Sequence, residues 1–142
     1  MNYDVFNGDA DGICALLQLR KAEPRESRLV TGVKRDINLL EKIQPAEGDQ
    51  VTVLDVSMDK NMAGLQRALA DGASVFYVDH HFPGEIPEHA SLTALINESP
   101  DVCTAALVNG LLVQVGTFDL VERLFSRISP LGLSQVFAVP VE

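Results

Sequence analysis

The sequence predicts an α/β domain built on a doubly wound parallel sheet of about five strands, with helices on both faces. Short runs rich in β-branched and aromatic residues alternate with segments in which apolar residues recur at helical spacing. Two of the runs, 51–54 and 75–78, are nearly free of polar residues, which is typical of strands covered on both faces. Alternating strands and helices of this length imply parallel strands joined by right-handed crossovers.

The expected strands are spread evenly along the first two thirds of the chain, at 3–6, 28–33, 51–54, 75–78 and 92–96. Two of the expected helices fill the first gaps between them. The first covers 13–22, with apolar residues at helical spacing at Ile13, Leu16 and Leu17. The second covers 36–44, with Ile37, Leu40 and Ile43 on one face, and ends before Pro45.

Two further helices follow. Asp59 is expected to cap the third, which Gly72 closes, and Ser99 is expected to begin the fourth. The domain prediction is therefore a metal-binding catalytic core at 1–115 and a tail of uncertain structure at 116–142.

Composition and charge exclude several classes of protein. At 142 residues the chain suits one domain with a buried core. No run approaches the roughly 20 apolar residues that span a bilayer. The first residues lack the features of a secretory signal, so we expect a cytoplasmic protein. Cys14 and Cys103 lack the spacing of a metal or redox motif and are expected to be buried free thiols.

The net charge of −9 argues against a surface that grips long nucleic acid, because such binding needs clustered Lys and Arg. The expected partner is a small phosphorylated substrate such as a short oligonucleotide, a nucleotide or pyrophosphate. No membrane partner is expected, and a homo-oligomer is an open alternative.

Acidic and histidine side chains gather where the expected strands end. They are Asp9 and Asp11 after the first strand, Asp55 after the third, and Asp79, His80 and His81 after the fourth. The carboxyl ends of parallel strands meet at one edge of the sheet, which is where ligand sites form in such folds. Three strands thus deliver four carboxylates and two imidazoles to one place.

Carboxylate oxygens and imidazole nitrogens suit divalent ions such as Mn²⁺ and Mg²⁺ better than a thiophilic ion. We expect two Mn²⁺ ions, with Mg²⁺ as the alternative. A pair of ions bridged by one carboxylate can activate water and neutralise charge developing on phosphorus. Asp55 is the natural bridge, and Asp9 and Asp11 can serve different ions. Lys34 and Arg35, after the second strand, can point at a substrate phosphate.

Structural interpretations of single residues stay open. Asp9, Asp11 and Asp55 also suit turn and helix-cap positions, although paired histidines have no such structural use. The segment 7–12 matches the first half of a calcium-binding loop, but the twelfth position of that loop is Gln18 instead of Glu.

Two other functions also stay open. A receiver domain with Asp55 as its phosphoacceptor fits the order of elements. Receivers, however, place Ser or Thr after strand four and Lys after strand five, where this chain has 79–81 (DHH) and 97–98 (NE). A catalytically silent metal-binding domain is the other alternative.

Four segments in order carry a family resemblance. They are 7–12 (NGDADG), the single Asp55, 79–81 (DHH) after a buried strand, and 103–108 (CTAALV). Together they resemble the DHH phosphoesterase superfamily, with the first segment closest to the RecJ-like form. The superfamily includes single-strand exonucleases, oligonucleotide and cyclic-dinucleotide phosphodiesterases, and family II inorganic pyrophosphatases.

The resemblance implies a metal-dependent hydrolase of phosphodiester or phosphoanhydride bonds. The implied metal ligands are Asp9, Asp11, Asp55, Asp79 and His80. The implied catalytic residues are Asp55, Asp79 and His81, and His81 also joins Lys34 and Arg35 as a substrate contact. The family usually adds a further ligand Asp and a second, substrate-binding domain. Neither is recognised in the sequence, so three alternatives stay open: a truncated form, a site that another chain completes, or a domain that binds metal with little turnover.

Overall fold

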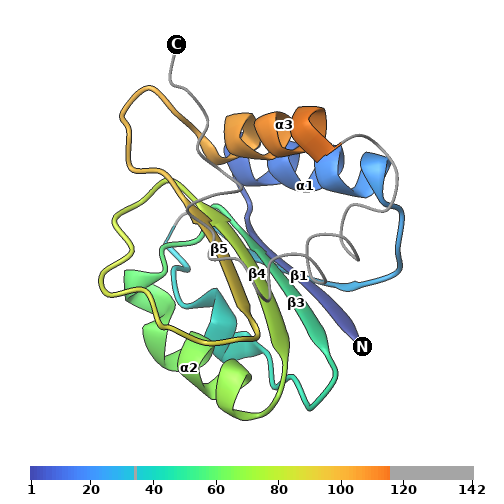
Figure 1. Ribbon diagram of the computed structural model, residues 1–142, viewed down its shortest axis with the longest axis vertical. Coiled ribbons are helices and arrows are strands. Elements are labelled where there is room, and N and C mark those ends of the chain that lie inside the picture. Colours follow the sequence, from blue (N-terminus) through green and yellow to red (C-terminus); the bar gives the residue numbers. More distant parts are fainter. Residues whose placement is uncertain (34, 116–142) are drawn as a thin grey trace.

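A five-stranded parallel sheet forms the centre of the structure, a computed structural model that describes residues 1–33 and 35–115 (Figure 1). The strands are β1 (Asn2–Asn7), β2 (Arg28–Gly32), β3 (Gln50–Leu54), β4 (Ser74–Asp79) and β5 (Leu92–Ile96). Their order in the sheet is β2-β1-β3-β4-β5, and every neighbouring pair is parallel. All five predicted strands are confirmed.

Helices cover both faces of this sheet. They are α1 (Ala10–Ala22), the 3₁₀ helices η1 (Leu39–Lys42) and η2 (Asp59–Asn61), α2 (Met62–Ala70) and α3 (Thr104–Val115). Figure 1 shows α1 and α3 side by side on one face and α2 on the other. The predicted doubly wound α/β architecture is therefore confirmed.

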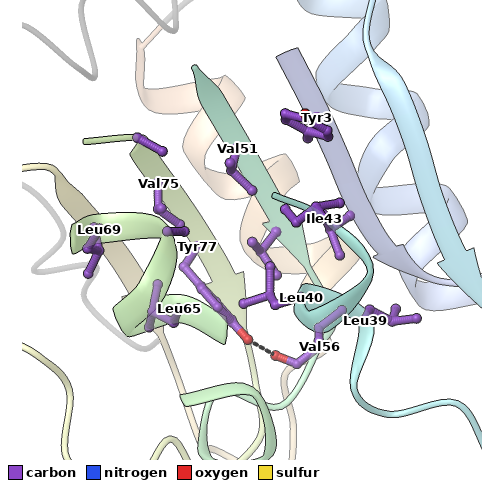
Figure 2. Packing of buried hydrophobic residues seen from close by; sticks show 14 of the residues in the cluster. Tyr3, Leu39, Leu40, Ile43, Val51, Val56, Leu65, Leu69, Val75 and Tyr77 are labelled. Carbon is purple, nitrogen blue, oxygen red and sulfur yellow. Dashed lines mark hydrogen bonds between the residues drawn. The ribbon is translucent and has the colours of Figure 1, made fainter. Parts of the chain in front are cut away.

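Each face of the sheet has its own apolar core. On one side, residues of β1, β3 and β4 pack against η1 and α2, as Figure 2 shows. Within that core the buried Tyr77 hydroxyl donates a hydrogen bond to the Val56 carbonyl oxygen at 2.7 Å, which ties β4 to the segment that follows β3. On the other side, Phe6, Leu54 and Val78 pack against α1 and α3. The strands between these two cores are held firmly, so the residues at their ends are well placed.

The chain diverges at the ends of β1 and β3, which are neighbours in the sheet. After β1 it enters α1 on one face, and after β3 it enters η2 and α2 on the other. A crevice forms outside the sheet wherever neighbouring connections leave in opposite directions. The segments that begin with Asp9 and Asp55 flank this point.

The helix predicted at 36–44 is wrong except for the single 3₁₀ turn of η1. The buried Asn61 side chain accepts a hydrogen bond from the Leu40 N–H at 3.1 Å and donates one to the Ile37 carbonyl oxygen at 2.7 Å. These contacts take up backbone groups that an α-helix would pair internally. Of the three residues predicted to share one face of this helix, Leu40 and Ile43 are buried, but Ile37 is 51% exposed.

The fourth helix also begins later than predicted, at Thr104 instead of Ser99. Ser99 lies in a turn, where its carbonyl oxygen accepts a hydrogen bond from the Val102 N–H at 3.2 Å. The N–H groups that open α3 are taken by the carboxylate of Asp11, which is 93 residues earlier in the chain. A distant side chain therefore caps this helix, and local sequence does not reveal it.

Two smaller expectations about the helices need correction. Of the three apolar residues expected on the first helix, Leu16 is buried as part of the face that α1 packs with Ala15 and Leu19, whereas Ile13 and Leu17 are 42% and 54% exposed. Helix α2 begins at Met62, after the separate turn of η2 that contains Asp59, so Asp59 does not cap it.

The two cysteines are free, as predicted, but both Cys14 and Cys103 are exposed, so the expectation that they are buried is wrong. Within the described residues, no helix has the length and apolar character needed to cross a bilayer. The expectations for Lys34 and for 116–142 fall outside the residues that the structure describes.

Candidate metal centre

Four of the predicted residues meet beyond the ends of β3 and β4. Each of Asp55, Asp79, His80 and His81 offers one ligand atom, and these atoms lie within 4.8 Å of one another. The sequence predicted this meeting, because β3 and β4 are neighbouring parallel strands whose carboxyl ends reach the same edge. A mixed oxygen and nitrogen donor set of this kind suits a divalent cation.

Asp55 leaves β3 through a left-handed backbone turn with φ of 60°. Non-glycine residues seldom adopt this conformation, and Asp and Asn tolerate it better than most others. The Asp55 N–H donates to the Val78 carbonyl oxygen at 3.0 Å, which fixes the turn against β4. Strained backbone of this kind often marks a functional site. Here it holds a carboxylate that is 2% exposed at the sheet edge.

The charge of Asp55 is poorly compensated. Burial, together with the nearby carboxylates of Asp11 and Asp9, raises the pKa of Asp55 to about 8. The Nε2 atom of His80 lies 3.1 Å from Asp55 Oδ1 and 3.4 Å from Asp11 Oδ2. One imidazole nitrogen therefore faces two acidic oxygens, an arrangement that a bound cation would neutralise.

Asp79 contacts His81 and leaves one oxygen unused. Its Oδ1 atom lies 2.7 Å from Nδ1 of His81, which orients that ring. Its Oδ2 atom is buried without a hydrogen-bond partner among the described residues. Burial raises the pKa of Asp79, and the hydrogen bond from His81 offsets part of that rise. Buried carboxylate oxygens in native proteins normally have a partner, so the unpaired Oδ2 is suited to bind a cation.

Asp11 stands at the N-terminus of α3, where the helix dipole favours negative charge. Its carboxylate oxygens accept hydrogen bonds from the backbone N–H groups of Thr104 at 3.1 Å and Ala105 at 2.7 Å. Although burial works to raise it, the pKa of Asp11 is lowered by these two donors. The helix terminus thus keeps Asp11 ionised beside the less acidic Asp55.

Thr104 connects the two carboxylates that face His80. Its backbone N–H donates to Asp11, and its hydroxyl donates to Asp55 Oδ1 at 3.2 Å. The Thr104 side chain is fully buried. Thr104 was not predicted as a site residue, although the segment 103–108 was one of the four that carried the family resemblance.

Asp9 both caps a helix and lines the site. Its Oδ1 atom accepts from the Gly12 N–H at 3.1 Å at the start of α1, so the capping interpretation is confirmed. It also lines a cavity together with Asp55 and His81. Gly12 has no room for a side chain, because a Cβ there would lie 2.2 Å from the Asn7 carbonyl oxygen. The glycine of the first motif is thus required by the tight turn that presents Asp9 and Asp11.

The residues present fit a divalent cation. The unpaired buried oxygen of Asp79, the raised pKa of Asp55 and the donor set within 4.8 Å all point the same way. Arg35, predicted to contact substrate, is exposed and does not line this cavity. Its role stays a prediction.

The comparisons with known proteins agree with this chemistry. The model of the DHH family, N-terminal domain, matches residues 3–128. That span includes β1 through α3 and every residue of the centre described above. No curated protein and no solved structure matches the chain.

Proposed function

The chain belongs to the DHH family, and from that membership we propose that it is a divalent-metal-dependent hydrolase of phosphodiester or phosphoanhydride bonds. Phosphoesterase-type hydrolysis is what the family implies. The unpaired buried Oδ2 of Asp79, set among three other ligand residues, is the observation that most supports a metal-dependent form of that activity.

We propose Asp9, Asp11, Asp55, Asp79 and His80 as the residues that hold the metal, with Mn²⁺ preferred and Mg²⁺ as the alternative. Carboxylate and neutral imidazole donors are consistent with either ion. Two such ions, when bound, would supply a hydroxide nucleophile at neutral pH and neutralise charge on the phosphoryl group.

The protein's own groups would position that chemistry. Asp79 orients the His81 ring through its contact with Nδ1, which leaves Nε2 free to meet a phosphoryl oxygen or a ligand. Thr104 holds Asp55 by a hydrogen bond, and α3 holds Asp11 by its first N–H groups. These contacts preorganise the ligands, and hydrogen bonds to metal-binding side chains of this kind tune the affinity of a metal site.

The proposed substrate is a small phosphorylated molecule. The net charge of −9 disfavours a long polyanion, whereas a short oligonucleotide or a nucleotide needs few phosphate contacts. The receiver alternative is less favoured, because the family whose model matches residues 3–128 is the DHH family. The sheet order alone does not separate the two, since receivers share it.

The test is hydrolysis of bis(4-nitrophenyl) phosphate and of pyrophosphate with Mn²⁺, with Mg²⁺ and with a chelator. We expect turnover of at least one compound that depends on the metal. Asp55→Asn keeps the side chain's shape and its tolerance of the left-handed turn, and it is expected to lower the rate by about 10³-fold, because it removes several kcal/mol of charge stabilisation.

Asp71→Asn is the matched control, because Asp71 is an exposed residue at the end of α2. It is expected to keep the wild-type rate. A folded wild-type chain that binds Mn²⁺ but turns over neither compound would favour the catalytically silent alternative. Activity that survives Asp55→Asn would remove the proposed mechanism.

A further inference from the structure

A cavity of about 410 Å³ adjoins the candidate metal centre. One end is formed by Asp9, Asp55 and His81, and the other by segments on the η1 and η2 side of the sheet. Its volume lies in the range of small-molecule binding sites, which is roughly 300–1,000 Å³. A phosphoryl group at the metal end would leave most of this space for the rest of the substrate.

Lys60 is the one lysine or arginine among the described residues that line this cavity. It is exposed, and its ammonium group makes no hydrogen bond or ion pair within the described part of the chain. Its backbone N–H is fixed by the Ser57 hydroxyl at 3.4 Å, so the lysine starts from a defined position. An unpaired cation facing a cavity is suited to an anionic group of a ligand.

The acidic residue on that side of the cavity does not compete for this lysine. Asp36 also lines the cavity, but its carboxylate forms an ion pair with Lys42. The negative charge of Asp36 is therefore offset by a residue outside the cavity. Lys60 remains available to a ligand.

Part of the cavity lining is apolar and held in place. Ile37 is exposed and Leu39 is buried, and both line the cavity. The buried Asn61 side chain donates to the carbonyl oxygens of Ile37 at 2.7 Å and Ser57 at 2.9 Å, which ties these two lining residues together. A preorganised apolar wall loses little entropy when a flat ring packs on it.

We propose that Lys60 determines the substrate preference of this cavity: with the scissile phosphate at the metal ligands, the Lys60 ammonium group contacts a second phosphate on the same nucleotide unit. The inference rests on the proposed function for the position of the scissile bond at the metal ligands. The metal ligands, with an ion bound, would take one phosphoryl group, so a separate cation in the cavity lining matches a separate anion. Pyrophosphate would leave the apolar wall unused, whereas a 5′-phosphorylated dinucleotide would use both.

The test compares two dithymidine probes, pTpT and TpT, which differ only in the 5′-phosphate. Their internucleotide linkage is a phosphorothioate, to slow cleavage, and calorimetry in Mn²⁺ buffer measures both affinities. We expect the wild-type chain to prefer pTpT by about tenfold, as a charge-assisted contact implies. Lys60→Ala is expected to reduce that preference to less than about twofold while leaving the affinity for TpT unchanged.

Lys60→Arg is expected to keep most of the preference for pTpT. Lys21→Ala is the matched control, because Lys21 is an exposed lysine at the end of α1 and does not line the cavity. It is expected to bind both probes as the wild type does. Equal wild-type affinity for the two probes, absence of binding by either, or a preference that persists in Lys60→Ala would overturn the inference.

Hydrolysis and binding assays on the same protein variants distinguish this inference from the proposed function. Metal-dependent hydrolysis of bis(4-nitrophenyl) phosphate without a Lys60-dependent preference would keep the hydrolase and overturn the nucleotide cavity. A Lys60-dependent preference without hydrolysis of any phosphate ester would support the cavity and overturn the hydrolase.

Discussion

Two groups of buried carboxylates lie on the same sheet and differ in what neutralises them. Asp4, within β1, is 1% exposed and forms ion pairs with Arg20 at 2.6 Å and Arg25 at 3.5 Å. Asp55 and Asp79, at the ends of β3 and β4, are 2% and 0% exposed. Neither forms an ion pair with a lysine or arginine within the described residues.

The pKa shifts reflect this difference. Burial alone would raise the pKa of Asp4, but the Arg20 and Ser27 hydrogen bonds and the two guanidinium charges bring it below the usual value. Burial raises the pKa of Asp55 and of Asp79 without such compensation. A buried carboxylate that the protein neutralises itself supports the fold. One that it leaves uncompensated is suited to a cation from solution.

The largest expected effect comes from breaking the ion pair between Asp4, the compensated carboxylate, and Arg20. Arg20→Ala leaves Asp4 buried with a weaker partner in Arg25, and loss of one member of a buried ion pair costs about 3–5 kcal/mol. Urea denaturation of the two proteins measures the change in the free energy of unfolding. The neighbouring Lys21→Ala is the control, and as an exposed substitution it should stay within about 0.5 kcal/mol of wild type. A loss below 1 kcal/mol in Arg20→Ala would mean that the pair does not stabilise the fold.

At the uncompensated carboxylates, Asp55 and Asp79, the stability of the fold should depend on bound metal instead. Mn²⁺ at 100 times its dissociation constant is expected to raise the free energy of unfolding of the wild type by about 2.7 kcal/mol for each ion that binds. A chelator should reverse the rise, and Asp55→Asn should largely abolish it. Asp71→Asn should respond as the wild type does. An equal rise in Asp55→Asn would place the bound ion away from this carboxylate.

The sequence predicts well both the sheet and the convergence of the candidate ligand residues, because both follow from short-range patterns. Apolar β-branched runs mark each strand, and a parallel arrangement sends all strand ends to one edge. Asp55 and 79–81 therefore meet without any knowledge of distances. The strained turn at Asp55, in contrast, has no signal beyond the presence of an Asp.

The parts that the sequence does not predict depend on contacts between distant segments. Asn61 takes hydrogen bonds that reduce 36–44 to one 3₁₀ turn, and Asp11 supplies the cap that begins α3 at Thr104. Lys60 is indistinguishable in sequence from any surface lysine until the cavity beside it is seen. Each of these contacts spans at least 20 residues of sequence or a tertiary cavity, beyond the reach of local pattern.

A smaller effect tests the contact that holds Asp55. Thr104→Val removes the hydroxyl that donates to Asp55 and keeps the backbone N–H that donates to Asp11. Loss of such an outer contact lowers metal affinity by about 10–100-fold, which a Mn²⁺ titration measures. Thr104→Ser restores the hydroxyl and should recover most of the affinity. Equal affinity in Thr104→Val and wild type would show that Asp55 needs no help from α3.

Stability is also expected to depend on pH, with opposite signs for the two groups of carboxylates. Asp4 has a lowered pKa, so its contribution is present above pH 3.8 and is lost as the pH falls through its folded value. Asp55 has a pKa raised from 3.8 to about 8, so the metal-free folded state holds a proton that the unfolded state releases. Its contribution is therefore present below pH 3.8 and is lost as the pH rises toward 8.

Urea unfolding with a chelator, at several pH values between 4 and 8, tests the second sign. A difference of one bound proton changes the free energy of unfolding by about 1.4 kcal/mol per pH unit. Stability of the wild type should fall across this window, and Asp55→Asn should flatten the slope, with Asp79 left as a weaker source of the same trend. Saturating Mn²⁺ should reverse the slope, because metal and proton compete for the same oxygens. An unchanged slope in Asp55→Asn would mean that this carboxylate is compensated after all, which would remove the contrast with Asp4.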